Sequence, residues 1–301
     1  MKVNRIRQNL LPVLAAFIWG TAFVAQSVGA DYVEPFTFNT ARSAIAFLFL
    51  LALCLVRRKV QKGIVERATR SWKDLAVGGT CCGVALTVAS FLQQKGLETT
   101  TSGKAGFITA LYIVIVPILG VFLKKKAPRT IWISVALAVV GLYCLCITED
   151  FTITSGDFYI LLCAFCFSAH ILVIDHFTQT VDGVELSCVQ FLVVTVLSSM
   201  GMMATESPSL EALGMCLGPI LYVGIFSSGV AYTLQILAQK DSNPTVVSLL
   251  LSLESVFATL AGAVILHDQM SGKEYFGCVL MLVAVVLAQL PERKKPACAE
   301  V

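Results

Sequence analysis

The side chain with the most evident chemistry is Glu254, an acidic residue deep within an apolar stretch of the sequence. It lies ten residues into the stretch 244–266, which corresponds to about 15 Å along a helix. At that depth in a membrane, an ionised carboxylate costs several kcal/mol unless it faces water or a partner. A structural carboxyl, protonated or bonded between helices, is the alternative. We favour a carboxyl that lines a polar cavity.

Arg42 is the second charged residue within an apolar stretch. It lies six residues into 36–56, about 9 Å from the nearer surface by the same helical rise. Two interpretations are open. The guanidinium extends outward to pair with Asp31 or Glu34, or it recognises the carboxylate of a bound substrate.

Four further side chains are candidates for a cavity wall, because they are polar or aromatic and lie away from the ends of their apolar stretches. They are Trp19, Tyr112, His170 and Gln235. Helix packing or hydrogen bonding between helices is the alternative for each, and for any one of them alone it is the stronger explanation.

Metal and nucleotide chemistry are not predicted. Cys163, Cys166 and His170 fall on one helical face, as a metal-binding trio would, but no complementary His or Cys cluster occurs elsewhere. Small buried apolar side chains are therefore the favoured interpretation of the two cysteines. The run 102–104 has Ser-Gly-Lys but lacks the spacing of a phosphate-binding loop. The cysteines number eleven and lie mostly in apolar stretches, so neither a disulfide framework nor a cofactor is expected.

The elements that must position these residues are membrane-spanning helices. Of the 301 residues, 57% are apolar and 14% charged, whereas soluble domains have about 25% charged residues. Apolar runs of about twenty residues are long enough to cross the hydrocarbon core. The expected spans are 10–29, 36–56, 73–94, 102–123, 128–147, 156–176, 185–203, 214–238, 244–266 and 272–290. The sequence thus predicts an all-α polytopic membrane protein with ten transmembrane helices.

The distribution of charge predicts the orientation. With a cytoplasmic N-terminus, 18 basic residues fall in inside loops and tails and 3 in outside loops, and Arg42 stays within a span. This bias follows the positive-inside rule and predicts that both termini are cytoplasmic. The first apolar run is too long for a cleavable signal peptide, so it is expected to remain as a helix. The net charge of +3 gives no indication of nucleic-acid binding.

An internal repeat divides the chain into 1–150 and 151–301. The segment 83–87, Gly-Val-Ala-Leu-Thr, matches 229–233, Gly-Val-Ala-Tyr-Thr, and Leu111 through Gly120 aligns with Leu253 through Gly262. In this alignment Tyr112 is the counterpart of Glu254. Because five spans per half is an odd number, the second half must enter the membrane from the opposite side. Two inverted five-helix repeats are typical of secondary transporters.

The chain resembles the EamA-type members of the drug/metabolite transporter superfamily over nearly its whole length. The residues that carry the resemblance are Trp19-Gly20, Arg42, the segment 101–112 and the segment 252–258. The resemblance implies ten helices, a bacterial inner-membrane location and movement of small metabolites, often the export of amino acids. Ser255 stands where such chains usually have Pro, so we expect a straighter ninth helix.

The sequence therefore predicts a secondary transporter that moves a small metabolite, such as an amino acid, across the inner membrane by alternating access, in the export direction. Proton coupling and a homodimer are compatible with it. The alternatives are an intramembrane enzyme or a non-transporting membrane scaffold. An enzyme would need a nucleophile, a metal cluster or paired acids at depth, and the sequence offers no HExxH motif, no GxSxG motif and no deep carboxylate pair.

Overall fold

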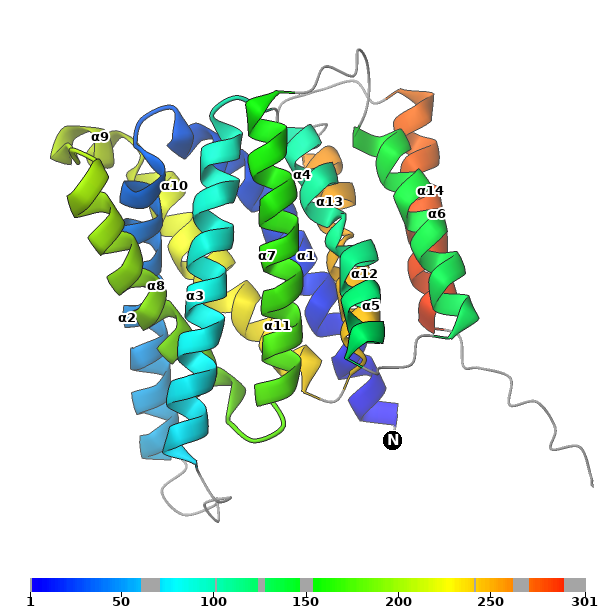
Figure 1. Ribbon diagram of the computed structural model, residues 1–301, viewed down its shortest axis with the longest axis horizontal. Coiled ribbons are helices and arrows are strands. Elements are labelled where there is room, and N and C mark those ends of the chain that lie inside the picture. Colours follow the sequence, from blue (N-terminus) through cyan, green and yellow to red (C-terminus); the bar gives the residue numbers. More distant parts are fainter. Residues whose placement is uncertain are drawn as a thin grey trace, which may run out of the picture.

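The computed structural model describes residues 2–60, 71–100, 102–123, 128–146, 154–240, 242–261 and 271–289. All regular structure within these ranges is helical (Figure 1). The helices are α1 (Lys2–Ala30), α2 (Pro35–Val60), α3 (Trp72–Leu97), α4 (Ser102–Ala110), α5 (Tyr112–Phe122), α6 (Arg129–Cys146), α7 (Ser155–Phe177), α8 (Gly183–Thr205), α9 (Leu210–Met215), α10 (Leu217–Tyr222), the π-helix η1 (Val223–Ala231), α11 (Tyr232–Gln239), α12 (Pro244–Leu251), α13 (Glu254–Ala261) and α14 (Gly272–Gln289).

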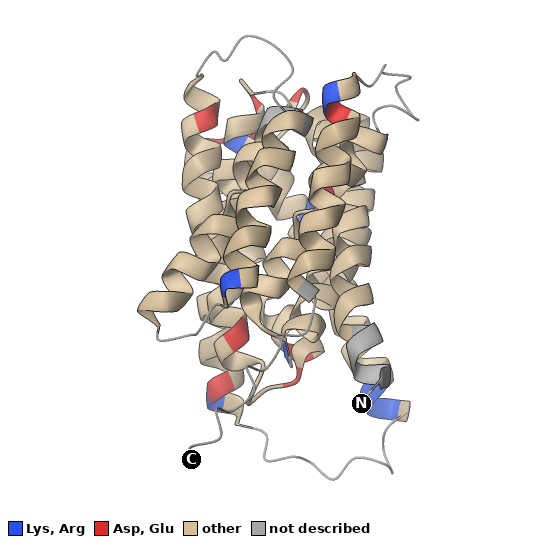
Figure 2. Cartoon of the chain, turned by 90° about the vertical axis from the view of Figure 1, so that its right-hand side faces the viewer, with Lys and Arg blue, Asp and Glu red and all other residues tan. Residues whose placement is uncertain are grey.

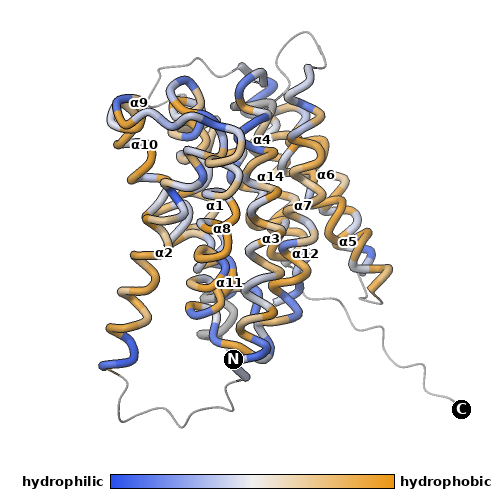
Figure 3. Tube along the Cα trace, turned by 60° about the vertical axis from the view of Figure 1, so that its left-hand side comes forward, coloured by the Kyte–Doolittle hydropathy of each residue, from blue (hydrophilic) through white to orange (hydrophobic). Residues whose placement is uncertain are grey.

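Eight stretches among the described residues are long and apolar enough to cross a membrane, and a shorter apolar helix covers Arg129–Cys144. The prediction of an all-α polytopic membrane protein is confirmed. The count of ten spans stays a prediction. Most charged residues gather toward the two ends of the helices, and apolar residues dominate between them (Figures 2 and 3). Large apolar side chains such as Leu48, Val84, Phe165 and Leu282 are exposed on the outer faces of the helices, as contact with lipid requires.

The helix neighbours occur in matched pairs. α6 packs along α14 at one side of the molecule, and α2 packs along α8 (Figure 1). α3 contacts α7 and α8, just as η1 contacts α1 and α2. α1 also contacts α12 and α13, and α7 contacts α4 and α5. This is the neighbour pattern expected if the second half repeats the first in inverted orientation.

Two glycines pack against equivalent positions in the two halves. A Cβ at Gly83 of α3 would meet Val193 and the backbone of Gln190 in α8, and a Cβ at Gly224 of η1 would meet Ile45 and the backbone of Arg42 in α2. Arg42 and Gln190 are each the eighth residue of their helix. We therefore treat these two residues as structural counterparts, separated by 148 positions in the sequence.

The spans predicted over 102–123 and 244–266 are not single helices. The first is broken at Leu111, between α4 and α5, and the second at Ser252 and Leu253, between α12 and α13. The expectation of a straighter ninth helix is therefore wrong. The hydroxyl of Ser252 donates to the Leu249 carbonyl at 2.8 Å, and the Leu253 amide bonds only three residues back, to Leu250, at 3.3 Å. Such local hydrogen bonds compete with the regular helical pattern.

The predicted span 214–238 contains a π-helix, η1, whereas the equivalent α3 is a continuous α-helix. In η1 the Tyr232 amide donates five residues back, to the Ser227 carbonyl. Such a π-helical turn is frequent at functional sites.

Candidate functional site

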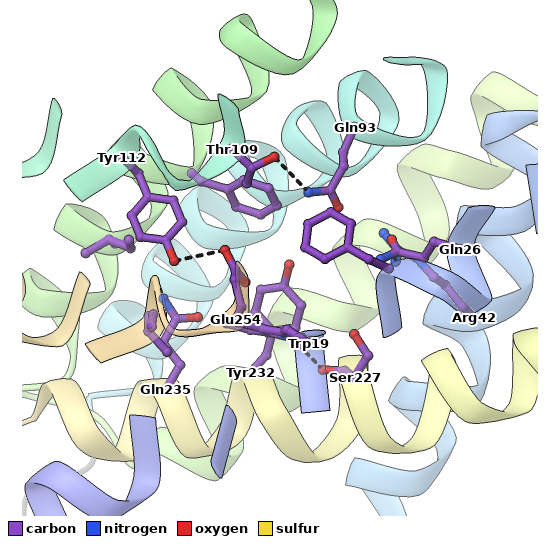
Figure 4. A pocket seen from close by; sticks show the side chains of 14 residues that line it. Trp19, Gln26, Arg42, Gln93, Thr109, Tyr112, Ser227, Tyr232, Gln235 and Glu254 are labelled. Carbon is purple, nitrogen blue, oxygen red and sulfur yellow. Dashed lines mark hydrogen bonds between the residues drawn. The ribbon is translucent and has the colours of Figure 1, made fainter. Parts of the chain in front are cut away.

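A cavity lies between the helices near the middle of the molecule. It encloses about 490 Å³ of space between side chains, its opening included. Its walls come from both halves of the chain, and most of the polar side chains on them are labelled in Figure 4. The lining residues are Trp19, Phe23, Gln26, Arg42, Gln93, Thr109, Tyr112, Phe167, Ile171, Ser227, Tyr232, Gln235, Leu251 and Glu254.

Glu254 and Tyr112 meet across the cavity wall. The Tyr112 hydroxyl donates to Glu254 Oε1 at 3.0 Å, and each residue is 4% exposed (Figure 4). Each is also the first residue of the helix that follows a break, α13 for Glu254 and α5 for Tyr112. The partial positive charge at the start of α13 favours a carboxylate at this place. The helix breaks thus position a stabilised acid and its hydrogen-bond donor against one another.

Arg42 lines the cavity at a different place from Glu254. Its Nη1 donates to Gln26 Oε1 at 2.8 Å, and its guanidinium lies 5.8 Å from the centre of the Phe38 ring. Arg42 is 6% exposed, and the described contacts include no ion pair with Asp31 or Glu34. In this structure the guanidinium therefore points into the cavity and not toward the membrane surface. Its role in binding stays a prediction.

Aromatic side chains form another part of the wall. The rings of Trp19 and Tyr232 meet edge to face at 4.8 Å, and the Trp19 indole N–H donates to the carbonyl of Ser227 at 3.3 Å (Figure 4). That carbonyl belongs to η1 and also accepts the backbone N–H of Tyr232. Tyr232 contacts the rings of Phe191 and His170 as well. The π-helix therefore supplies the carbonyl that holds Trp19 in place.

Five of the six candidate site residues lie on the cavity wall, namely Trp19, Arg42, Tyr112, Gln235 and Glu254. The sixth, His170, does not line it. His170 is fully buried, its Nε2 lies 3.1 Å from Gln190 Oε1, and its ring packs against Tyr232. Their role in substrate binding stays a prediction.

Sequence reasoning missed nine lining residues, among them Gln26, Gln93, Phe167 and Tyr232. Two of these carried a signal. Phe167 aligns with Trp19, and Tyr232 lies in the repeated segment 229–233. Gln26 and Gln93 have no such mark, because the direction of a single polar side chain depends on how its helix is rotated in the bundle.

The proposed trio Cys163, Cys166 and His170 does not come together as a metal site. Over the described ranges, no group of three His, Cys, Asp or Glu residues is placed to hold a metal ion. Cys163 and His170 are fully buried. This agrees with their interpretation as interior side chains.

The two ends of the α2–α8 pair, which carries Arg42, are held by different contacts. At one end Glu206 accepts hydrogen bonds from the amides of Phe36 and Thr37, at 2.8 and 2.6 Å. At the other, Arg57 contacts Asp182 at 3.1 Å. Asp182 also caps α8, since it accepts the amides of Val184 and Glu185.

Asp182 has a pKa below its ordinary value. Burial alone would raise the pKa, but the hydrogen bond from Arg57 and those from the two backbone amides together outweigh burial. The carboxylate is therefore held in its charged form where it joins α8 to the end of α2.

The fold and the cavity define a polytopic helical membrane protein with a polar, partly charged cavity between two halves, which is the architecture of a transporter. The sequence profile of the EamA-like transporter family matches residues 7–147 and again 154–290, and the chain belongs to this family. It is a multi-pass membrane transporter, and a small-molecule substrate and a surrounding bilayer follow from the family.

Several of its relatives are named as transporters. A protein of Archaeoglobus fulgidus named an uncharacterized transporter is 32% identical over 96% of this chain and 87% of its own length. A chloroplastic WAT1-related protein of Arabidopsis thaliana is 26% identical over 92% of this chain and 68% of its own length. One solved crystal structure has a TM-score of 0.76 and 19% identity, with 94% of this chain and 96% of that chain covered. This last likeness supports the fold alone.

Proposed function

We propose that this chain is a secondary transporter for a small zwitterionic metabolite, such as an amino acid or a related compound. Transport occurs by alternating access between two inverted five-helix halves, 1–150 and 151–301. The family profile matches once in each half, and seven of the fourteen lining residues precede residue 150 while seven follow it. A site built equally by both halves can open to either face when the halves exchange conformations.

The observation that carries the proposal is the charge on the cavity wall. Arg42 and Glu254 are both nearly fully buried, both line the same cavity, and no described ion pair joins them (Figure 4). Neutral groups partner them instead, Gln26 and Tyr112 respectively. Buried charges require a partner of opposite sign or extensive hydrogen bonding. A substrate with both a carboxylate and an ammonium group supplies both partners at once.

Glu254 also offers a means of coupling. When no substrate ammonium is present, a proton on the Glu254 carboxyl removes its charge, and the Tyr112 hydroxyl remains bonded to it. Proton and ammonium then compete for one carboxylate, which couples substrate movement to a proton gradient. We place the protein in the inner membrane with both termini cytoplasmic, on the charge bias of the loops. Export is the direction implied by the sequence resemblance.

The test is counterflow in proteoliposomes that are preloaded with pools of amino acids, simple amines, simple carboxylic acids and neutral sugars. We expect exchange of amino acids, weaker exchange of compounds with one charge, and dependence on an imposed pH gradient. Exchange of neutral compounds alone would contradict the zwitterion assignment. Chemical conversion of a pool member would indicate an enzyme, and the absence of any exchange would indicate a scaffold.

The control for that assay is Arg42→Gln, which keeps a hydrogen-bonding group near Gln26 but removes the cation. We expect the variant to lose its preference for amino acids over amines that lack a carboxylate. Protease protection of the C-terminal tail reports the orientation of the protein in the vesicles. Comparison of transport in preloaded vesicles of each orientation distinguishes export from import.

A further inference from the structure

The cavity is not symmetric, although its two halves are related. Eight of its lining residues form pairs of repeat counterparts, in which both members face the cavity: Trp19 with Phe167, Phe23 with Ile171, Thr109 with Leu251, and Tyr112 with Glu254. Arg42 and Gln26 line the cavity without their counterparts. By the separation of 148 residues that relates α1 to α7 and α2 to α8, those counterparts are Gln190 and Ile174.

The counterparts are packed away in this conformation. Arg42 and Gln26 retain 6% and 5% exposure, whereas Gln190 and Ile174 have 0%. Arg42 and Gln26 lie near the start of α2 and the end of α1, at the face predicted to be external. Gln190 and Ile174 lie near the start of α8 and the end of α7, at the face predicted to be cytoplasmic. The pair that lines the cavity and the pair that is covered thus belong to opposite ends of the molecule.

The covered position has unused hydrogen-bonding groups. Gln190 Oε1 lies 3.1 Å from His170 Nε2 on the preceding helix α7, as Arg42 contacts Gln26 on the preceding helix α1. Gln190 Nε2 and His170 Nδ1, both fully buried, have no partner among the described residues. Buried polar groups are nearly always hydrogen-bonded, so these two atoms require an explanation. A ligand that reaches them in another conformation is one.

Tyr232 separates this pair from the cavity. Its ring contacts Trp19 at 4.8 Å between centroids on the cavity side and His170 at 6.0 Å. Tyr232 itself lines the cavity, whereas His170 and Gln190 do not. A rotation of α11 or a displacement of the Tyr232 ring would join the covered pair to the same central space.

We propose that Gln190, held by its neighbour His170, forms a second substrate subsite, the cytoplasmic counterpart of the Arg42 position, which is covered here and becomes accessible when the halves exchange conformations. It rests on the proposed function. The ligand is the carboxylate of the same substrate, because the unpartnered N–H group of the Gln190 amide can donate to a carboxylate oxygen, while His170 Nε2 donates to Gln190 Oε1 and holds the amide in place. The two subsites differ in charge. The external one holds the carboxylate with a cation and the cytoplasmic one with a neutral amide donor, and the charge-assisted bond is the stronger.

The test measures sided access with small membrane-impermeant methanethiosulfonate reagents, one anionic and one cationic. The reporters are Gln26→Cys and Ile174→Cys, which leave Arg42 and Gln190 intact. The background lacks the exposed or partly exposed Cys81, Cys144 and Cys166, and also Cys146 and Cys298, whose side chains are not described, so the buried cysteines keep their packing. The unmodified background sets the baseline. Ser168→Cys is the matched control, because Ser168 lies on α7, is 0% exposed, and its counterpart Gly20 does not line the cavity.

We expect Gln26→Cys to react from the outside, with the anionic reagent faster by about tenfold because of the nearby guanidinium. Ile174→Cys should react only in inside-out vesicles, at least about tenfold faster than Ser168→Cys and without preference for either charge. When Gln190→Arg is added, Ile174→Cys should react faster with the anionic reagent than with the cationic one. When Arg42→Gln is added, Gln26→Cys should lose its faster reaction with the anionic reagent. His170→Cys is a second reporter in case Ile174→Cys does not reach the membrane.

Two results would overturn the subsite. In the first, the Ile174→Cys and His170→Cys variants react no faster than Ser168→Cys, although the same proteins exchange substrate in liposomes. That result would remove the subsite and leave the proposed function unchanged. The other is an anionic preference at Ile174→Cys without added arginine. Loss of the proposed function looks different, since the wild-type protein would then show no counterflow of any metabolite pool.

Discussion

Substitution of Glu254 by Gln removes one charge from the cavity and keeps the shape of the side chain. The amide oxygen can still accept the hydrogen bond that Tyr112 donates to Glu254 at 3.0 Å, so the variant should fold and reach the membrane. It cannot pair with a substrate ammonium as a carboxylate does, and it cannot take up a proton. A hydrogen bond to a charged group contributes about 1.5–3 kcal/mol. The apparent KM for an amino acid should therefore rise by about 10- to 150-fold.

The assay is counterflow at several external pH values in liposomes with equal amounts of wild-type and Glu254→Gln protein. Wild-type exchange should depend on pH, because proton and ammonium compete for the carboxylate, and the variant should lose that dependence. Glu211→Gln is the control, since Glu211 is exposed on α9 and does not line the cavity. If KM and pH dependence stay as in the wild type, the reasoning is refuted and Glu254 serves interhelical packing.

Three further predictions concern stability and orientation. Gly20→Ala should destabilise the protein by about 1–3 kcal/mol in thermal unfolding, because a Cβ there would lie 2.7 Å from the Glu254 carbonyl oxygen and 2.8 Å from the Ala258 amide nitrogen. Gly218→Ala is the control and should not destabilise the protein, because a Cβ at Gly218 would have no atom within 4 Å. Equal losses of stability in the two variants would contradict this packing. Asp182→Ala should cost about 0.5–2 kcal/mol through loss of the helix cap, more than Arg57→Ala at under about 1 kcal/mol. Because the pKa of Asp182 is lowered on folding, its contribution to the free energy of unfolding should be present above roughly pH 4 and disappear as the pH falls below that value. A contribution that vanishes between pH 5 and 8 would be inconsistent with the charged cap. Cys298, which lies outside the described residues, should react with an impermeant thiol reagent only after the cell membrane is opened, and labelling in intact cells would reverse the orientation.

Much of the fold could be predicted from the sequence because the membrane imposes a one-dimensional constraint. A chain segment in lipid must satisfy its own backbone hydrogen bonds, so length and hydropathy alone identify helical spans. The repeat also predicted that Tyr112 and Glu254 are counterparts, and the structure places them in direct contact. Five of the six candidate residues line one cavity for the same reason. A polar or charged side chain in the middle of an apolar helix has few other places to lie.

What the sequence determined by itself was therefore the class of fold, the spans and the deep polar residues, since each depends on composition within a single segment. Tertiary structure alone decided how those segments meet. It broke the fourth and ninth spans directly before Tyr112 and Glu254, and it wound part of the eighth span as the π-helix η1. It also exposed Arg42 to the cavity while covering Gln190. These outcomes depend on helix rotation and on contacts between residues far apart in the chain, which no local pattern encodes.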